Sequence, residues 1–330
     1  MEHLGGLARY VITEGSPATL NPAARERSVM ETDPTLSAVN GSVALDTFTD
    51  PLLVDPGPAL LSAVIDAYRG AAPALVDPDI DELRAAATDD EGPLGRFSDL
   101  PTLTVLADDR VVDAVTKRFV SASRLAALVE SGCCRLRTGV EPQPAAVLAG
   151  RDAGCVLVEP GPPRERCDGD DTGVGSVLRL GSDPTLRERY AHLAEASEER
   201  LLRTPSRHRA FDAFRDRCGE TVAAAVVRAI DTRPDPSVDD AADARTRAYA
   251  VGVRHGALDG DLRRACEDAG LGSHSTFTRI KRGLREVGLL TTESVPQAVG
   301  RPRERLVASG ALAVAEEPEA VVAAIRAELG

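Results

Sequence analysis

The apolar positions of the first half of the chain alternate between helical spacing and short continuous runs. Leu61, Val64, Ile65 and Tyr68 recur at helical spacing within PALLSAVIDAY, residues 58–68, which predicts an amphipathic helix. TLTVLA at 102–107 is typical of a buried strand. Residues 108–132 are then predicted to form one long helix, with Asp108 or Asp109 as its N-cap and Gly132 just past its end.

Three further apolar runs, CCRLRT, AAVLAG and GCVLVE, follow between residues 133 and 159 and are separated by Gly and Pro. Each has the length and the punctuation of a strand. Helices that alternate with strands indicate a small α/β domain, which we place at residues 41–183. Residues 160–175 (PGPPRERCDGDDTGVG) carry too few apolar side chains to pack and are expected to be a loop.

Residues 184–236 have a helical pattern and are predicted to be a helical connector. Leu186, Tyr190, Leu193 and Leu201 are expected on one helix, and a second is expected to carry Phe211, Phe214, Val222, Val226 and Ile230. Pro234 and Pro236 then end the helical pattern and predict a domain boundary.

The apolar spacing between residues 237 and 312 predicts three helices followed by a hairpin. The first helix covers 243–253, and the second carries Leu262, Ala265, Cys266 and Ala269 on one face. Gly270 and Gly272 permit a tight turn, and Ser273 or Ser275 can cap the third helix, which buries Phe277, Ile280, Leu284 and Val287 and ends at Gly288. Strands LLTTESV and RERLVA flank PQAVGRP. This order is that of a winged helix-turn-helix, with a C-terminal helix expected at 313–330.

The distribution of charge along the chain indicates a function for this predicted domain. The chain of 330 residues has 52 acidic and 39 basic side chains and a net charge of −13, yet residues 271–307 hold seven bases against three acids. A helix fits the major groove of B-DNA, and a merely solvated surface of this protein should be acidic. We therefore expect DNA contacts from Ser273, His274, Ser275, Thr278, Arg279, Lys281, Arg282 and Arg285 on the third helix and from Arg301, Arg303 and Arg305 in the hairpin.

The stretch from Gly270 to Leu306, with LRTPSR at 202–207 and the run 99–132, resembles the TbsP family of haloarchaeal transcriptional regulators. The resemblance covers roughly residues 60–314 and is most specific in the last third. It implies a winged-helix regulator, a repressor or an activator, of sugar and gluconeogenic genes. One departure is ALDGDLRRACEDAG (257–270), which stands where the family has an aromatic-containing helix, so that the operator and the target genes can differ.

Motifs of several enzyme classes are missing from the sequence. Neither of the two lysines, Lys117 and Lys281, follows a glycine as in a phosphate-binding loop, there is no G-x-S-x-G, and GVGSVLRLG lacks the third glycine of a dinucleotide site. The six cysteines have no zinc spacing and are expected to be buried thiols of a reducing cytoplasm. We expect no enzyme activity, cofactor or metal. A protein-docking winged helix or a degenerate metabolite-binding enzyme domain stays open as the alternative.

Further expectations concern partners and setting. One recognition helix reads few base pairs, so we expect a homodimer on a promoter operator in double-stranded DNA. Lys117 and Arg118 are either a solvated surface or a site for a small anionic metabolite effector. The absence of a long apolar run predicts a cytoplasmic protein without membrane contact, and the acidic, lysine-poor composition favours a halophilic archaeon. Residues 1–40 are expected to be disordered or a mis-assigned start, since METDPTLSAVNGS from Met30 reads like a natural N-terminus.

Overall fold

The computed structural model describes residues 33–38, 40–88, 100–139, 141–158, 176–179 (backbone only), 185–232, 243–298 and 300–329. The prediction for residues 1–40 falls mainly outside this part of the chain, as do the predicted loop at 160–175 and both Pro234 and Pro236. The helices described before residue 200 are η1 (Leu45–Thr47), α1 (Pro58–Ala71), α2 (Pro73–Val76), α3 (Ile80–Ala87), α5 (Asp109–Val115), α6 (Phe119–Glu130) and α7 (Leu186–Ala196).

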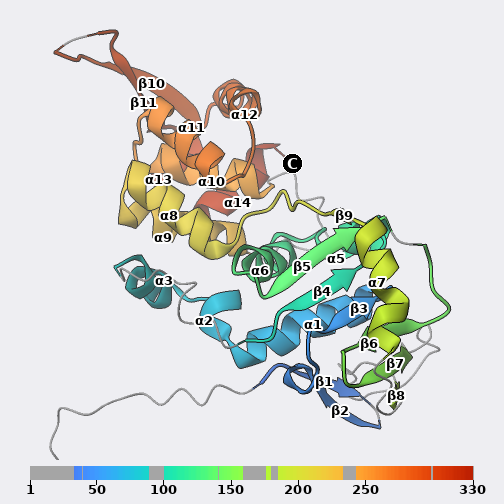
Figure 1. Cartoon of the computed structure of the whole chain (residues 1–330). Coiled ribbons are helices and arrows are strands. Elements are labelled where there is room, and N and C mark those ends of the chain that lie inside the picture. Colours follow the sequence, from blue (N-terminus) through green and yellow to red (C-terminus); the bar gives the residue numbers. More distant parts are fainter. Residues whose placement is uncertain are drawn as a thin grey trace, which may run out of the picture. The chain divides into compact units, whose positions relative to one another are not determined.

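Within the described residues, seven strands form one mixed sheet in the order β8-β7-β6-β3-β4-β5-β9 (Figure 1). Its strands are β3 (Leu52–Val54), β4 (Leu103–Leu106), β5 (Cys134–Thr138), β6 (Ala146–Ala149), β7 (Gly154–Val158), β8 (Ser176–Arg179) and β9 (Glu198–Glu199). β3, β4 and β5 pair in parallel, as helix-containing connections require, and the remaining pairs are antiparallel. Strands β1 (Thr35–Ala38) and β2 (Gly41–Ala44) form a separate hairpin.

Apolar side chains cover both faces of the centre of the sheet. On one face, Leu53 and Val105 pack with residues of α1, α2, α5 and α6. On the other, Leu52 and Leu106 pack with Leu186 of α7. A parallel centre with helices on both faces is the layered arrangement of an α/β domain, so the predicted fold class is confirmed for this part.

The predicted helix at 108–132 is two helices, α5 and α6. The expected ends are correct, because the Asp108 side chain accepts from the Arg110 N–H at 2.7 Å and Gly132 has φ +79°. The interior breaks at Thr116, whose Oγ1 donates to the Val112 carbonyl at 2.7 Å, and Arg118 is extended with ψ 138°. A Thr hydroxyl that bonds to the preceding turn competes with helix propagation, and the break leaves Lys117 and Arg118 exposed.

The second predicted helix of the 184–236 segment is also divided, into α8 (Arg207–Cys218) and α9 (Glu220–Asp231). Gly219 separates them with φ +92° and ψ 161°, a conformation that L side chains rarely adopt. Leu201 was assigned wrongly to the first helix. α7 ends at Ala196, and the next residue, Ser197, is extended. Leu201 therefore lies outside the helix, after β9, and is 79% exposed.

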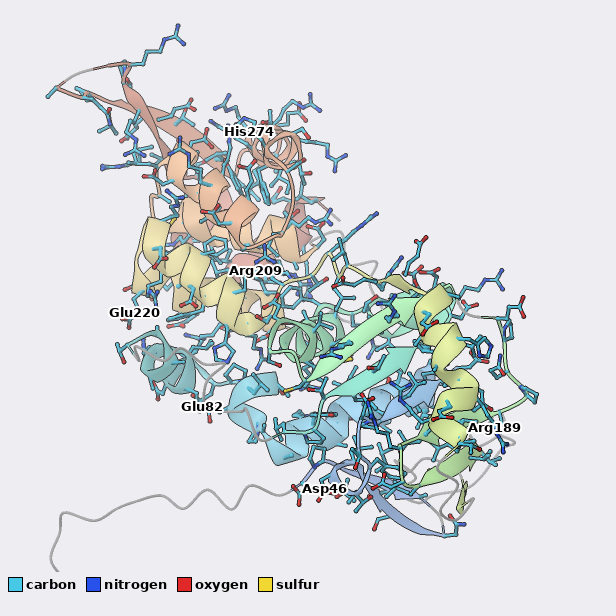
Figure 2. The ribbon with its side chains drawn as sticks, viewed as in Figure 1. Asp46, Glu82, Arg189, Arg209, Glu220 and His274 are labelled. Atoms are coloured by element: carbon cyan, nitrogen blue, oxygen red, sulfur yellow. The ribbon has the colours of Figure 1, made fainter. Side chains whose placement is uncertain are left out.

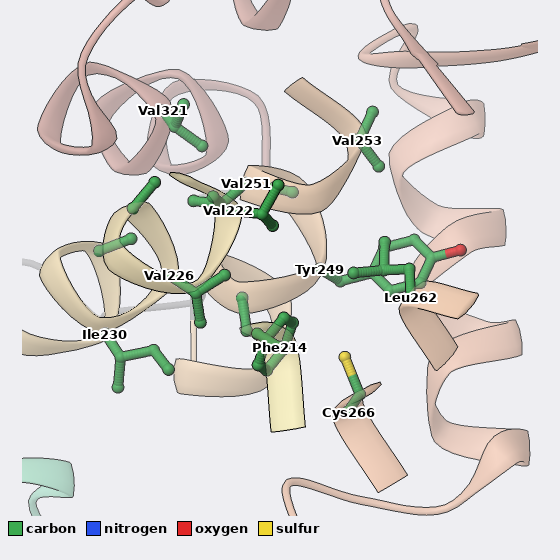
Figure 3. Packing of buried hydrophobic residues seen from close by; sticks show 14 of the residues in the cluster. Phe214, Val222, Val226, Ile230, Tyr249, Val251, Val253, Leu262, Cys266 and Val321 are labelled. Carbon is green, nitrogen blue, oxygen red and sulfur yellow. The ribbon is translucent and has the colours of Figure 1, made fainter. Parts of the chain in front are cut away.

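The C-terminal part is helical, with a two-stranded wing. It comprises α10 (Ala244–Arg254), α11 (Asp259–Asp268), α12 (His274–Glu286), β10 (Leu290–Val295), β11 (Arg303–Ala308), α13 (Gly310–Val314) and α14 (Pro318–Leu329). The predicted order of three helices, hairpin and final helix is confirmed. α8, α9 and α14 share one apolar core with α10, α11 and α12, and Figure 3 shows Phe214, Val226, Tyr249, Leu262 and Val321 from five of these helices in it.

Ion pairs join this helical core to the helices of the α/β part. Arg207 at the start of α8 pairs with Asp77 after α2 and, at 2.8 Å, with Asp231 of α9. Arg84 of α3 donates to Glu220 of α9 at 2.8 Å. The predicted connector therefore belongs to two cores: α7 packs on the sheet, whereas α8 and α9 pack with the winged helix.

Candidate nucleic-acid interface

A tight turn joins α11 to α12. Gly270 has φ +80°, and the Leu271 N–H donates to the Cys266 carbonyl at 2.9 Å, as in a glycine-terminated helix. Gly272 does not have a positive φ. Ser273 occupies the N-cap position of α12, but neither it nor Ser275 makes the predicted side-chain cap, since the two hydroxyls hydrogen-bond each other at 2.9 Å.

The two faces of α12 differ in chemistry. Phe277 and Leu284 are fully buried, and the Phe277 ring stacks on Tyr249 of α10 with centroids 5.9 Å apart. Ile280 and Val287 are half-buried at the edge of the same core. The opposite face exposes seven of the predicted contacts, namely Ser273, His274, Ser275, Thr278, Arg279, Arg282 and Arg285.

Lys281 does not lie on that exposed face. Its side chain is 9% exposed, and its Nζ donates to Asp259 Oδ2 at 2.9 Å and to Glu304 of the wing. At 100° per residue, position 281 follows Phe277 by four residues and therefore faces the same side of the helix. The spacing was visible in the sequence, but the acidic partners that neutralise the lysine come from α11 and β11.

Asp259, at the start of α11, accepts hydrogen bonds from side chains of α10, α12 and α11 itself. Tyr249 Oη donates to Oδ1 at 2.6 Å, Lys281 Nζ to Oδ2, and Arg263 reaches both oxygens at 3.0 and 2.5 Å. We call Asp259, Tyr249, Arg263, Lys281 and Glu304 the Asp259 cluster. It fixes α10, α11, α12 and the wing to one another.

The surroundings of the Asp259 cluster lower the pKa of Asp259 and raise the pKa of Tyr249. Burial alone would raise the pKa of Asp259, but the hydrogen bonds from Tyr249, Lys281 and Arg263 outweigh it and lower that pKa. Burial, and then the bond to Asp259, raise the pKa of Tyr249. The carboxylate therefore stays ionised and the phenol neutral near neutral pH.

Arg263 links the cluster to the start of α12. Its Nη1 lies 2.9 Å from His274 Nε2 and 3.2 Å from Thr278 Oγ1, and Thr278 also donates to the His274 carbonyl. The His274 side chain is nevertheless 68% exposed. Sequence reasoning missed Arg263, and a signal existed, since arginine four residues after Asp259 on one helix predicts an i,i+4 pair.

The wing presents its arginines unequally. Glu293 faces Arg305 and Val295 faces Arg303 across the strands, and Arg301 and Arg305 are exposed. Arg303 is half-buried and pairs with Asp261 of α11. Arg285 of α12 lies 3.4 Å from Thr292 Oγ1 and 3.9 Å from Glu304.

Two consecutive parts of the chain match models of known protein families. Residues 71–205 match the family described as transcriptional regulator TbsP-like, N-terminal, and residues 206–326 match the transcriptional regulator TbsP-like, C-terminal HTH domain. The chain thus has both domains of a TbsP-like transcriptional regulator. It is a DNA-binding protein of the helix-turn-helix class, and the resemblance inferred from the sequence is confirmed at that level. Among curated proteins and solved structures, none matches the chain.

The boundary of the TbsP-like C-terminal domain, at residue 206, coincides with the start of α8. This matches the core, in which α8 and α9 pack with the winged helix. Across the described ranges, no group of three or more metal-binding side chains comes together, and no helix there is long and apolar enough to cross a membrane. Four cysteines in the same ranges are buried thiols, Cys133, Cys134, Cys155 and Cys266, while Cys218 is half-buried and Cys167 lies outside them.

Proposed function

We propose that this regulator binds promoter operators by inserting α12 into the major groove of double-stranded DNA. The observation that carries the proposal is the division of α12 into an apolar face, on which Phe277 and Leu284 are fully buried, and an exposed face with Arg279 and Arg282. Arginine donates two parallel hydrogen bonds to guanine, the commonest specific contact in the major groove. Arg282 is 71% exposed, and within the described residues its one ion pair is with Glu286 at 3.7 Å.

The remaining contacts divide into two groups. Ser273, His274, Ser275, Thr278 and Arg285 surround the two arginines, and Arg301 and Arg305 extend from the wing towards the backbone phosphates. Lys281 and Arg303 are left out of the proposed contacts, since both are engaged by carboxylates of the domain. We assign them the role of holding the wing against α11 and α12.

Assembly and biological setting extend the proposal. Two copies of the chain would present two α12 helices to the half-sites of an inverted repeat, with the α/β part as the regulatory or dimerisation domain. The resemblance supports genes of central sugar metabolism as targets in a cytoplasmic protein. The acidic composition supports a halophilic archaeal host. Whether the regulator represses or activates would follow from where the operator lies relative to the promoter.

A selection experiment tests this function. Full-length protein is incubated with fragments of its own genome, and retained fragments are sequenced and footprinted. The expected result is enrichment of promoter fragments that share an inverted repeat. Equal retention of all fragments would contradict sequence-specific binding and would favour a winged helix that docks on a protein.

A further inference from the structure

A cavity of about 260 Å³ lies where the two family domains meet. Its wall is formed by residues 202–205, which lead into α8, and by residues 270–272, the turn that leads into α12. Three arginines complete it: Arg203 in the first segment, Arg209 on α8 and Arg245 on α10. We call it the arginine cavity. Figure 2 shows Arg209 on α8 and His274 at the N-terminal end of α12.

The arginine cavity has more positive than negative charge. Arg203 is exposed and Arg245 is half-buried, and within the described residues neither has a carboxylate within ion-pair distance. Elsewhere in the same residues most arginines pair with acids, for example Arg207 with Asp77 and Asp231. Two guanidinium groups that no described carboxylate neutralises therefore belong to the lining of one cavity in a chain of net charge −13.

Arg209 is held in a fixed position beside the turn. Its Nε donates to the Asp268 carbonyl at 3.2 Å, and its Nη1 is 4.0 Å from Glu130, so its charge is only partly compensated. A Cβ placed on Gly270 would lie 3.4 Å from Arg209 Nη2. The guanidinium thus packs over the glycine whose positive φ sets the direction of α12.

We propose that the arginine cavity binds a small anion that carries a phosphate group, and that the bound anion alters the DNA affinity of α12. Planar guanidinium groups donate paired hydrogen bonds to phosphate and carboxylate oxygens. The volume lies just below the usual range of small-molecule sites, which suits a short phosphate ester. A concave site also suits a small ligand better than the convex backbone of a DNA duplex.

The coupling follows from the position of the cavity and rests on the proposed DNA-binding function. An anion bridging Arg203, Arg209 and Arg245 would fix the entry to α8, the start of α10 and the turn before α12 in one arrangement. A ligand that favours one arrangement of that turn shifts the population of α12 positions available to DNA. Lys117 and Arg118, the site considered from the sequence, are exposed at the α5–α6 break and line no part of this cavity.

The test is a titration of the full chain, without DNA, with glycerol 3-phosphate, followed by calorimetry or by the shift of the melting temperature at constant ionic strength. Citrate serves as a carboxylate probe and glycerol as an uncharged one. We expect saturable binding of glycerol 3-phosphate, weakened about tenfold or more by Arg203→Gln and by Arg245→Gln, since charge-assisted contacts are lost. Arg110→Gln, at an exposed arginine of α5, is the matched control and should bind as the wild type does.

Several outcomes would overturn the proposal. One is binding that is equal in the wild type, Arg203→Gln and Arg245→Gln; another is no saturable binding of glycerol 3-phosphate. If citrate binds more tightly than glycerol 3-phosphate, the ligand of the cavity is a carboxylate and not a phosphate. If the wild type binds no anion and the two variants lose DNA affinity, the arginines are DNA-backbone contacts instead. Operator affinity with and without saturating glycerol 3-phosphate should differ about fivefold or more, and equal affinities would remove the coupling. Because the titration needs no DNA, its failure is distinguishable from failure of the DNA-binding function.

Discussion

At the scale of single residues, Asp259 is the buried carboxylate that binds charged and polar side chains of the winged helix. Its carboxylate is 7% exposed and accepts from Tyr249, Arg263 and Lys281. Removing one partner of a buried ion pair leaves the others charged and unpaired, which costs much more than losing a surface pair. Asp259 therefore determines whether α12 and the wing keep their positions.

We expect Asp259→Ala to destabilise the protein by about 3–5 kcal/mol, because Lys281 and Arg263 lose their buried partner. Asp268→Ala on the same helix is the control. Asp268 is half-exposed and pairs with Arg217, so its loss should cost less than about 1 kcal/mol. Urea unfolding followed by helical circular dichroism measures both. Equal, small losses would show that the Asp259 cluster contributes no stability.

The lowered pKa of Asp259 also predicts a pH dependence. Because the folded-state pKa lies below the ordinary value of 3.8, the carboxylate stabilises the fold fully above that value, and this contribution is lost as the pH falls through the folded pKa. The stability difference between the wild type and Asp259→Asn should therefore be constant at neutral pH and shrink below about pH 4. Unfolding titrations at several acidic pH values measure it, and a difference that grows on acidification would contradict the assignment.

The site could be predicted from the sequence only in part. Exposed positions such as Arg279 and Arg282 follow from helical spacing once Phe277 is placed in the core. The same spacing places Lys281 on the side of Phe277, but the sequence does not show that Lys281 and Arg303 are neutralised, because their partners, Asp259 and Asp261, lie more than twenty and forty residues away in the chain. Local charge counts do not show which charges are neutralised by the fold.

At the scale of elements, the approach of α10 to α11 positions the recognition helix. A Cβ placed on Gly252 of α10 would lie 2.3 Å from Leu262 Cδ1, so that the fully buried Leu262 side chain would have to repack within the core. Gly252→Ala should therefore separate the helices and cost about 1–3 kcal/mol. Gly283→Ala on α12, where a Cβ would meet no described atom within 4 Å beyond the adjoining helix backbone, should instead stabilise by about 0.5–1 kcal/mol. Thermal unfolding of the two variants compares them, and equal shifts would contradict close helix packing.

Elements with a complete apolar pattern were predictable, and those defined by one residue or by distant pairing were not. α11 and α12 keep their periodicity over their whole length. The break between α8 and α9 depends on Gly219 alone, inside a pattern that looks continuous. β9 has two residues, Glu198 and Glu199, and becomes a strand only because β5 pairs with it.

At the scale of the whole molecule, the salt dependence of DNA binding tests which bases face DNA. Arg279 and Arg282 are proposed to contact bases, and Lys281 and Arg303 are in internal pairs. Of the seven bases, the exposed arginines Arg285, Arg301 and Arg305 are then left to neutralise phosphates. At about 0.9 per neutralised phosphate, we expect a log–log slope near −3 for each protomer. A slope near −6 would mean that all seven bases contact phosphates. Cation uptake by Glu293 or Glu304 would make the slope shallower still and would let binding survive molar potassium chloride.

Assembly is the second test at this scale. A dimer should protect an inverted repeat with half-site centres about one helical turn apart. Light scattering of the protein, alone and with operator DNA, together with the footprint, measures this. A monomer that protects one half-site would contradict the dimer.

The central claim is that Arg279 and Arg282 read base edges, and the most direct test is the base preference of each single Ala variant. Binding is measured against operators changed one position at a time, with Arg110→Ala as the control. We expect each helix variant to lose about 1–3 kcal/mol of affinity and its preference at one base position, while Arg301→Ala weakens binding to all operators alike. Unchanged preference in both helix variants would contradict the claim that this face of α12 recognises DNA.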